Sequence, residues 1–460
     1  MNLQVRKNII DESPFTKFHL KLTIVSAGGP FIDGYLLSII GIALVSINQS
    51  FEVSSLWSGL LGSSTLIGMF LGALLFGYLT DKMGREFLYK YDLWAFFFIS
   101  ISFLFVDSIL MIFVLRFLLG IAIGADYPIA TSLLTEFAPK KYRGKMLGTL
   151  ICSWFLGAIT AYGVGYFLLE TGVGSWKLIL ATGAIPTIIV LFLRSKTPES
   201  PRWLRMKGQD DKALSVLQGI YGPKASLDDI PKPTTNKVKV SKLFSKQYRK
   251  RMLFVCLFWN FGVIPIYAVY TFVPSILANL NLNSGNAAYI GSGIIEGCFL
   301  IGCIFGVILI ERLGRRNLLL MGFWVTSVAL LGLSIFSEAS IIWIITLFAI
   351  FALFAGASNV LEWIYPNELF PTDVRASAVG FATAASRFGA ATGTLLLPIL
   401  LDATNLGVTM LVVTIINVLG LIVTYLWAPE TTNQSLDEAS RGLDEVVSTQ
   451  KEFVPTIEKV

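Results

Sequence analysis

The chain contains few of the residues from which catalytic and metal sites are usually built. It has one histidine, His19, and four cysteines in 460 residues. Cys152, Cys256, Cys298 and Cys303 stand in apolar stretches without the spacing of zinc or redox motifs, so we interpret them as packing residues. The sequence also lacks nucleotide-binding, zinc-protease and serine-hydrolase signatures. We therefore predict no metal site, no cofactor and no enzymatic activity.

Charged residues are scarce as well, at 14% of the chain, whereas soluble proteins carry about 25%. Their segregation leaves apolar runs long enough for a helix to cross a hydrocarbon core of about 30 Å. Because a helix satisfies its own backbone hydrogen bonds in lipid, we predict an all-α membrane protein. The twelve expected spans are residues 20–46, 56–80, 88–106, 109–134, 145–169, 176–194, 251–280, 286–310, 317–336, 340–365, 376–401 and 406–428.

The basic residues lie on one side of these spans. Of the 36 lysines and arginines, all but Lys177, Arg116 and Arg387 fall in the termini or in loops after even-numbered spans. The positive-inside rule then places both termini in the cytoplasm. The basic residues behind the net charge of +6 therefore orient a multi-pass protein of the cell membrane, whose partners include the lipid bilayer. They do not indicate a nucleic-acid partner.

A polar loop occurs twice, half the chain apart. Residues 81–85 read D-K-M-G-R and residues 311–315 read E-R-L-G-R, and a glutamate–arginine pair near residue 140 recurs near residue 370. Such a duplication is typical of secondary transporters, which bind substrate between the halves. We predict that these charges form a cytoplasmic gate, with fixed structural pairs as the alternative. The gate residues are Asp81, Gly84, Arg85, Glu136, Arg143, Glu311, Gly314, Arg315, Glu368 and Arg375.

The distribution of spans predicts five segments. A proline-containing polar stretch with a short helical pattern near 209–220 separates two sets of six spans, and a polar tail follows the last span. The segments are a cytoplasmic N-terminal part (1–19), a six-helix bundle (20–194), a cytoplasmic linker with short surface helices (195–250), a second six-helix bundle (251–428) and a cytoplasmic tail (429–460).

Several ordered motifs resemble those of the major facilitator superfamily, above all its sugar-porter and general-substrate branch. They are D-K-M-G-R-E from Asp81, R-F-L-L-G-I-A-I-G from Arg116, P-E-S-P-R-W-L from Pro198, E-R-L-G-R-R from Glu311 and P-E-T-T from Pro429. The G-G-P-F-I-D-G-Y run from Gly28 and the G-A-D-Y-P run from Gly124 are similar to bacterial metabolite transporters. The resemblance implies two pseudo-symmetric six-helix bundles and alternating-access transport of a small molecule by a monomer.

Six ionisable residues within the spans are candidate site residues by default, because an unpaired charge there costs about 2.5–3.5 kcal/mol on insertion scales. They are Asp33, Arg116, Asp126, Glu296, Glu362 and Arg387. With a single histidine near a cytoplasmic edge, proton coupling needs a carboxylate. We predict that Asp33 carries the proton, that Arg116 modulates it in one conformation, and that Asp126 belongs to the same coupling site. A fixed Asp33–Arg116 pair is the structural alternative.

The surroundings of Asp33 bear on this role. Gly28, Gly29 and Pro30 precede it, and we expect them to loosen the helix so that freed carbonyls line a cavity. In the sugar porters that the chain resembles, an acidic residue follows the G-Y pair, where Leu36 stands here. In the phosphate symporters, to which the chain has a weaker likeness, positions matching Asp33 serve proton transfer.

The remaining polar residues within the spans predict a substrate site. The candidate binding residues are Tyr127, Asn260, Asn359, Glu362, Trp363 and Arg387. Amide and aromatic groups suit a small polar solute, and an arginine suits a carboxylate or phosphate. We predict a transporter for a sugar-like molecule or an organic anion, by proton symport. A uniporter, an exporter and a nutrient sensor that does not transport are the alternatives.

Overall fold

The computed structural model describes residues 9–83, 85–139, 141–171, 175–195, 197–230, 243–245, 248–279, 285–370 and 372–432. Within these ranges the side chains of residues 76–91, 125, 127–132, 206, 278–279, 285–289, 372–373 and 376 are not described. Every described element of secondary structure is a helix.

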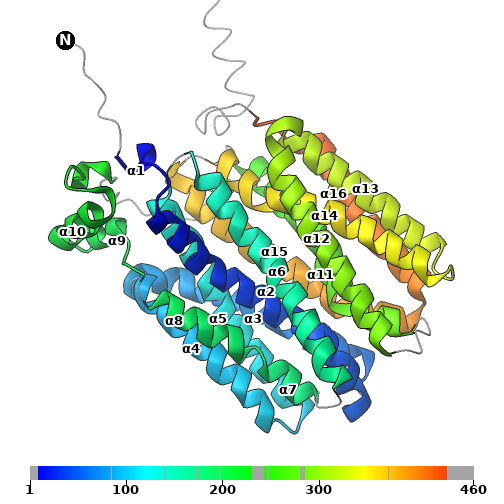
Figure 1. Ribbon diagram of the computed structural model, residues 1–460. Helices are drawn as coiled ribbons and strands as arrows, with labels where there is room; N and C mark the ends of the chain where they lie inside the picture. Colours follow the sequence, from blue (N-terminus) through cyan, green and yellow to red (C-terminus); the bar gives the residue numbers. More distant parts are fainter. Residues whose placement is uncertain are drawn as a thin grey trace, which may run out of the picture.

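Two sets of long helices correspond to the two predicted bundles and lie side by side (Figure 1). The first set comprises α2 (Lys17–Phe51), α3 (Ser55–Met83), α4 (Arg85–Ser102), α5 (Ile109–Phe137), α6 (Arg143–Glu170) and the pair α7 (Trp176–Ala181) and α8 (Ala184–Arg194). The second set comprises α11 (Arg249–Asn279), α12 (Gly285–Leu313), α13 (Arg315–Ile335), α14 (Ile341–Leu369), α15 (Thr372–Ala403) and α16 (Leu406–Trp427). We call these sets the N-half and the C-half.

Short helices gather at one end of the molecule. They are α1 (Ile9–Glu12), α9 (Pro201–Met206) and α10 (Asp210–Tyr221), with a 3-10 turn at Leu227–Asp229. Figure 1 shows α1, α9 and α10 together beside the predicted cytoplasmic ends of the N-half. The short helix predicted near 209–220 is therefore present, and the linker packs against the N-half through it.

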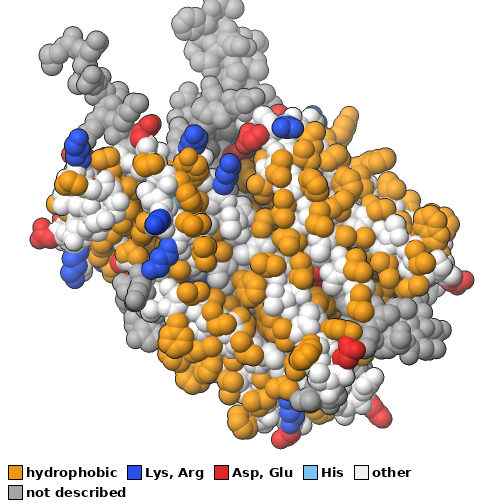
Figure 2. Space-filling model, viewed as in Figure 1, with side chains coloured by type: hydrophobic (Ala, Val, Ile, Leu, Met, Phe, Trp, Pro, Cys, Tyr) orange, Lys and Arg blue, Asp and Glu red, His pale blue; other side chains and the backbone are white. Residues whose placement is uncertain are grey.

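The surface is that of a membrane protein. Ten helices in the described part of the chain are long and apolar enough to span a bilayer, and the apolar stretches Asp92–Phe105 and Ile109–Gly124 lie in the third and fourth predicted spans. Large apolar side chains such as Phe192 and Trp343 are exposed on this surface. In Figure 2 apolar side chains cover the middle of the visible face, whereas Lys and Arg gather mainly at the end that carries the short helices. The predicted twelve-span architecture is confirmed.

Glycines bring helices into close contact, as their frequency in the spans predicts. A Cβ atom at Gly68 on α3 would overlap the backbone of Phe117 on α5, and one at Gly120 on α5 would overlap the backbone of Thr65 on α3. In lipid, where helices gain little from hydrophobic burial against each other, such close packing is a main source of association.

Polar contacts join the two halves at their predicted outer ends. Ser55 Oγ on α3 donates to Asp402 Oδ2 on α15 at 2.9 Å, and Tyr162 Oη on α6 donates to the Tyr270 carbonyl on α11 at 2.9 Å. Gly59 on α3 packs directly against the backbone of Leu395 on α15. The molecule is therefore closed on the predicted outer side.

Candidate transport site

Asp33 is buried in the middle of α2. Its residue is 1% exposed, and its Oδ1 atom has no hydrogen-bond partner among the described residues. The charges that act on it belong to Asp126 and Arg194 in the N-half and to Arg387 in the C-half. Asp33 thus lies where charges of both halves meet. Because an isolated buried carboxylate is costly, the protonated form is favoured when these arginines are engaged elsewhere.

The helix around Asp33 is not loosened. α2 is helical throughout Lys17–Phe51, including Gly28, Gly29 and Pro30. The helix is thus not interrupted here, although Pro30 has no N–H to donate to the carbonyl one turn earlier; a cavity lined by this segment stays a prediction. The glycine has another use: a Cβ atom at Gly29 would overlap Asp126 Oδ2 and Arg194 Nη2. The missing side chain makes room for an ion pair one helical turn from Asp33.

This ion pair is fully buried and involves an arginine from the end of α8. Arg194 Nη1 and Nη2 donate to Asp126 Oδ1 and Oδ2 at 2.5 and 3.0 Å, and both side chains are 0% exposed. Asp92 on α4 adds a second carboxylate, with its Oδ1 3.8 Å from Arg194 Nη1. Such two-pronged arginine–carboxylate contacts fix both groups in place. Asp126 lies close enough to Asp33 to act on it electrostatically, and in this conformation Arg194 holds it; its part in proton coupling stays a prediction.

Arg116 does not pair with Asp33. Its Nε donates to the Leu61 carbonyl on α3 at 3.0 Å, and its Nη2 has no partner among the described residues. Tyr270 of the C-half lies within electrostatic range of Arg116. A permanent Asp33–Arg116 pair, the structural alternative, is therefore contradicted, whereas contact in a different conformation stays a prediction.

In the C-half the predicted binding residues lie on three neighbouring helices. Arg387 on α15 donates to Tyr267 Oη on α11 at 2.7 Å and lies over the same ring, with 5.8 Å between guanidinium carbon and ring centroid. Asn359 Nδ2 donates to Glu362 Oε2 at 2.8 Å on α14. Glu362 is 4% exposed and interacts electrostatically with Arg387. The structure thus brings together Asn359, Glu362 and Arg387.

Asn260 and Trp363 complete this group. Asn260 Nδ2 donates to the Cys256 carbonyl one turn earlier at 2.7 Å, and its Oδ1 packs closely against Gly389 on α15. The ring of Trp363 meets Trp259 edge to face, with centroids 5.1 Å apart. Tyr127, the N-half candidate, has its side chain outside the described residues.

Glu296 on α12 is a further buried carboxylate. It is 2% exposed, and its Oε2 has no partner among the described residues. Its charge bears on Tyr162 and Tyr270, which join the two halves. It therefore lies near the contact between the halves.

The two described gate charges of the N-half contact the linker and the N-terminal segment. Glu136 accepts a hydrogen bond from Ser200, which caps α9, and Arg143 Nη2 donates to Asp11 Oδ1 at 2.8 Å. The side chains of Asp81 and Arg85, and Gly84 altogether, lie outside the described residues.

The C-half gate charges form one network. Arg315 Nη2 lies 3.0 Å from Glu311 Oε1 and 3.1 Å from Glu368 Oε1. Gly314 adopts a φ of 84°, and Glu430 accepts hydrogen bonds from the backbone amides of the following turn. Arg375 Nε donates to the Phe370 carbonyl at 3.0 Å. These contacts tie helix ends together within one half, and the role of the residues as a gate stays a prediction.

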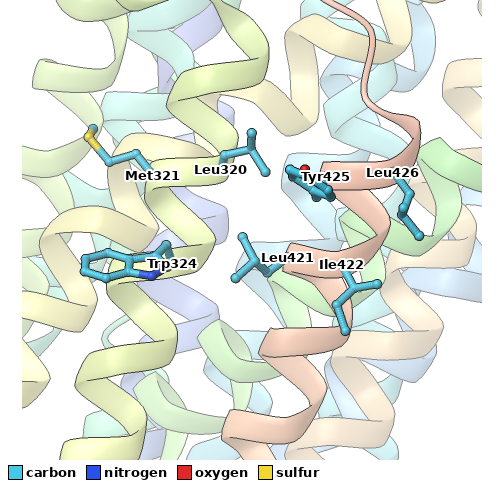
Figure 3. Close-up of a pocket in the computed structure, with 7 residues that line it drawn as sticks. All are labelled: Leu320, Met321, Trp324, Leu421, Ile422, Tyr425 and Leu426. Atoms are coloured by element: carbon cyan, nitrogen blue, oxygen red, sulfur yellow. The ribbon is translucent and has the colours of Figure 1, made fainter.

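Cavities differ sharply in character. A groove of about 510 Å³ on the outer surface between α13 and α16 is lined by apolar and aromatic side chains, among them Met321, Trp324 and Leu421 (Figure 3). It faces the side where lipid lies and offers a polar solute few partners. A cavity of about 10 Å³ inside the C-half borders Glu362 and Asn417, which is room for about one water molecule. In the described part of the chain, no group of three or more His, Cys, Asp or Glu side chains could hold a metal ion.

The sequence reasoning missed Asp92, Arg194 and Tyr267. Asp92 lies inside a predicted span and could have been selected by the same criterion as Asp33. Arg194 ends a span and was assigned to the basic cytoplasmic edge, yet its side chain is completely buried. Tyr267 has no charge and carries no signal in a single sequence that separates it from a packing residue.

Two six-helix halves with buried charges near their junction define a membrane transporter. The chain belongs to the family described as "Sugar (and other) transporter", whose model matches residues 22–443. The chain is 38% identical to YaaU of Escherichia coli K12, which carries a provisional name as a metabolite transport protein. The match covers 94% of this chain and 96% of YaaU. The chain is 33% identical to the inner membrane metabolite transport protein YgcS of the same organism, covering 92% of this chain and 94% of the relative.

Solved structures agree on the fold. The inward-open structure of the xylose transporter XylE from Escherichia coli superposes on this chain with a TM-score of 0.78 at 20% identity. The superposition covers 92% of this chain and 99% of XylE. The comparisons therefore establish the major-facilitator fold and the multi-pass location in the cell membrane. They also show that the family is one of transporters and not of enzymes.

Proposed function

We propose that this transporter moves a small polar metabolite by proton symport, with Asp33 as the proton-carrying residue. The observation that carries the proposal is the position of Asp33: buried, without a hydrogen-bond partner for Oδ1 among the described residues, and within the electrostatic range of an arginine from each half. A carboxylate at such a junction changes its surroundings when the halves move, so it can bind a proton in one conformation and release it in another.

The proposed substrate site is the group of Asn260, Asn359, Glu362, Trp363 and Arg387. Amide, carboxylate and guanidinium groups are present together with an aromatic ring, a set that suits hydroxyl groups or a carboxylate on a small solute. Relatives are named for arabinose, glucose and niacin, which are solutes of this size and polarity. A sugar-like molecule or an organic anion is the substrate class that we propose.

The test is uptake by the purified protein in proteoliposomes. Radiolabelled arabinose, xylose, glucose and niacin are offered with and without an inward proton gradient. We expect at least one solute to accumulate above equilibrium only with the gradient, and Asp33→Asn to abolish this accumulation. Asp107→Asn is the matched control, because Asp107 is a highly exposed carboxylate that pairs with Lys177 at the predicted outer side. Accumulation by Asp33→Asn at the wild-type level would remove Asp33 from this role.

A further inference from the structure

Three buried carboxylates of the N-half lie around one buried arginine, Arg194. Asp33, Asp92 and Asp126 are each at most 8% exposed, and Arg194 is the arginine that lies among them. Full ionisation would place three negative charges around Arg194, and the further described cation that acts on one of them, Asp33, is Arg387 of the C-half. Uncompensated buried charges cost several kcal/mol each, so this group of carboxylates binds protons. Asp126 accepts two hydrogen bonds from Arg194, whereas Asp33 and Asp92 each keep one buried oxygen without a partner among the described residues, so we take these two as the proton-binding members.

Asp92 has the geometry of a second proton site. Its Oδ1 accepts a hydrogen bond from the Leu93 amide at 2.7 Å and lies 3.8 Å from Arg194 Nη1. Its Oδ2 is buried and has no partner among the described residues. Asp126 and Asp92 therefore contact the same guanidinium nitrogen, and one oxygen of Asp92 is available for a proton.

The carboxylates are also ordered along the membrane. α4 begins at Arg85, at the predicted cytoplasmic end, and Asp92 lies about two turns further in. Asp33 lies about four turns into α2, which begins at the same end. The Asp126–Arg194 pair packs against Gly29, one turn before Asp33. The order from the membrane interior to the cytoplasm is thus Asp33, the ion pair, and Asp92.

We propose that Asp92 receives the proton that Asp33 releases and passes it to the cytoplasm. The O–H bond at Asp33 breaks, an O–H bond forms at Asp92, and the proton then leaves to cytoplasmic water. Asp126 keeps its two hydrogen bonds to Arg194, which lies between the two sites. This inference rests on the proposed proton symport, and it adds an exit site that the symport itself does not require.

The experiment compares two modes of transport by Asp92→Asn. Gradient-driven accumulation needs proton release in every cycle, whereas counterflow exchanges solute without it. With the solute from the panel that wild type accumulates, we expect accumulation to fall at least about tenfold and counterflow to stay within about twofold of wild type. Asp92→Glu should restore part of the accumulation. A parallel loss of both modes with no rescue by glutamate would show a structural role and overturn the proposal.

A second measurement needs no transported solute. Infrared difference spectra of the reconstituted protein between acid and alkaline buffer report the C=O band of protonated carboxyl groups. We expect the band of Asp92→Asn to lack a component that the bands of wild type and Asp107→Asn both contain. A band of Asp92→Asn that still contains this component would overturn the proposal. The two hypotheses fail differently. Accumulation by Asp33→Asn refutes Asp33 as the proton carrier, whereas loss in Asp33→Asn with full accumulation by Asp92→Asn refutes only the exit site.

Discussion

Substitution of Gly29 by alanine tests the packing that underlies the site. A methyl group there would overlap Asp126 Oδ2 and Arg194 Nη2 and would lie 3.0 Å from Asp126 Cγ. Neither partner can withdraw easily, because both side chains are 0% exposed. Overpacking costs about 1–3 kcal/mol, and breaking a buried ion pair costs about 3–5 kcal/mol. Alanine regains up to about 1 kcal/mol through its higher helix propensity.

Where the methyl group is accommodated by breaking the ion pair, that cost less the gain in helix propensity leaves a net cost of about 2–4 kcal/mol. For a chain of this length that corresponds to a drop of about 2–4 °C in the apparent Tm of the purified protein. If only 1.4 kcal/mol of this cost falls on the step that moves the proton, gradient-driven uptake slows about tenfold. Gly163→Ala is the matched control, because a Cβ atom there meets nothing within 4 Å. A Gly29→Ala protein that melts and transports like Gly163→Ala would refute the packing argument.

Two further predictions concern the C-half and the junction of the halves. Arg387→Ala should weaken binding of a carboxylate solute such as niacin by about tenfold or more, since a charged hydrogen bond is worth about 1.5–3 kcal/mol. It should affect binding of a neutral sugar less. Equal losses for both solutes, measured as KM for uptake, would speak against anion recognition by this residue. Cys152 on α6 and Cys303 on α12 have their Sγ atoms 3.7 Å apart, so mild oxidation should link the halves. After protease cleavage in the linker, the two fragments should run together on a denaturing gel until reductant is added, whereas the fragments of a Cys303→Ser protein should separate on it without reductant.

The spans were predictable because lipid leaves so few alternatives. A run such as 20–46 has to be helical to satisfy its backbone, and α2 is helical over Lys17–Phe51. The helix extends past the apolar run at both ends, because hydropathy marks the lipid-facing length and not the end of hydrogen bonding. The short helix at Asp210–Tyr221 followed from its own periodicity in the same way.

The site was only half predictable. Asp33, Glu362 and Arg387 stood out because a charge within an apolar run needs an explanation. Arg194 did not stand out, since at the end of a span it has the same sequence signal as any orienting arginine. Its burial depends on how α4, α5 and α8 pack, which no local pattern encodes. Gly29 was likewise interpreted as a helix breaker, whereas its function is to let an ion pair approach the backbone.

The coupling of solute and proton movement is the most direct test of the account. A lightly buffered suspension of proteoliposomes, with a pH indicator outside, receives the solute that the wild-type protein accumulates. The account predicts that the external medium becomes more alkaline as solute enters, and that Asp33→Asn shows no such change. Solute entry without a change of pH, or with acidification of the medium, would contradict proton symport.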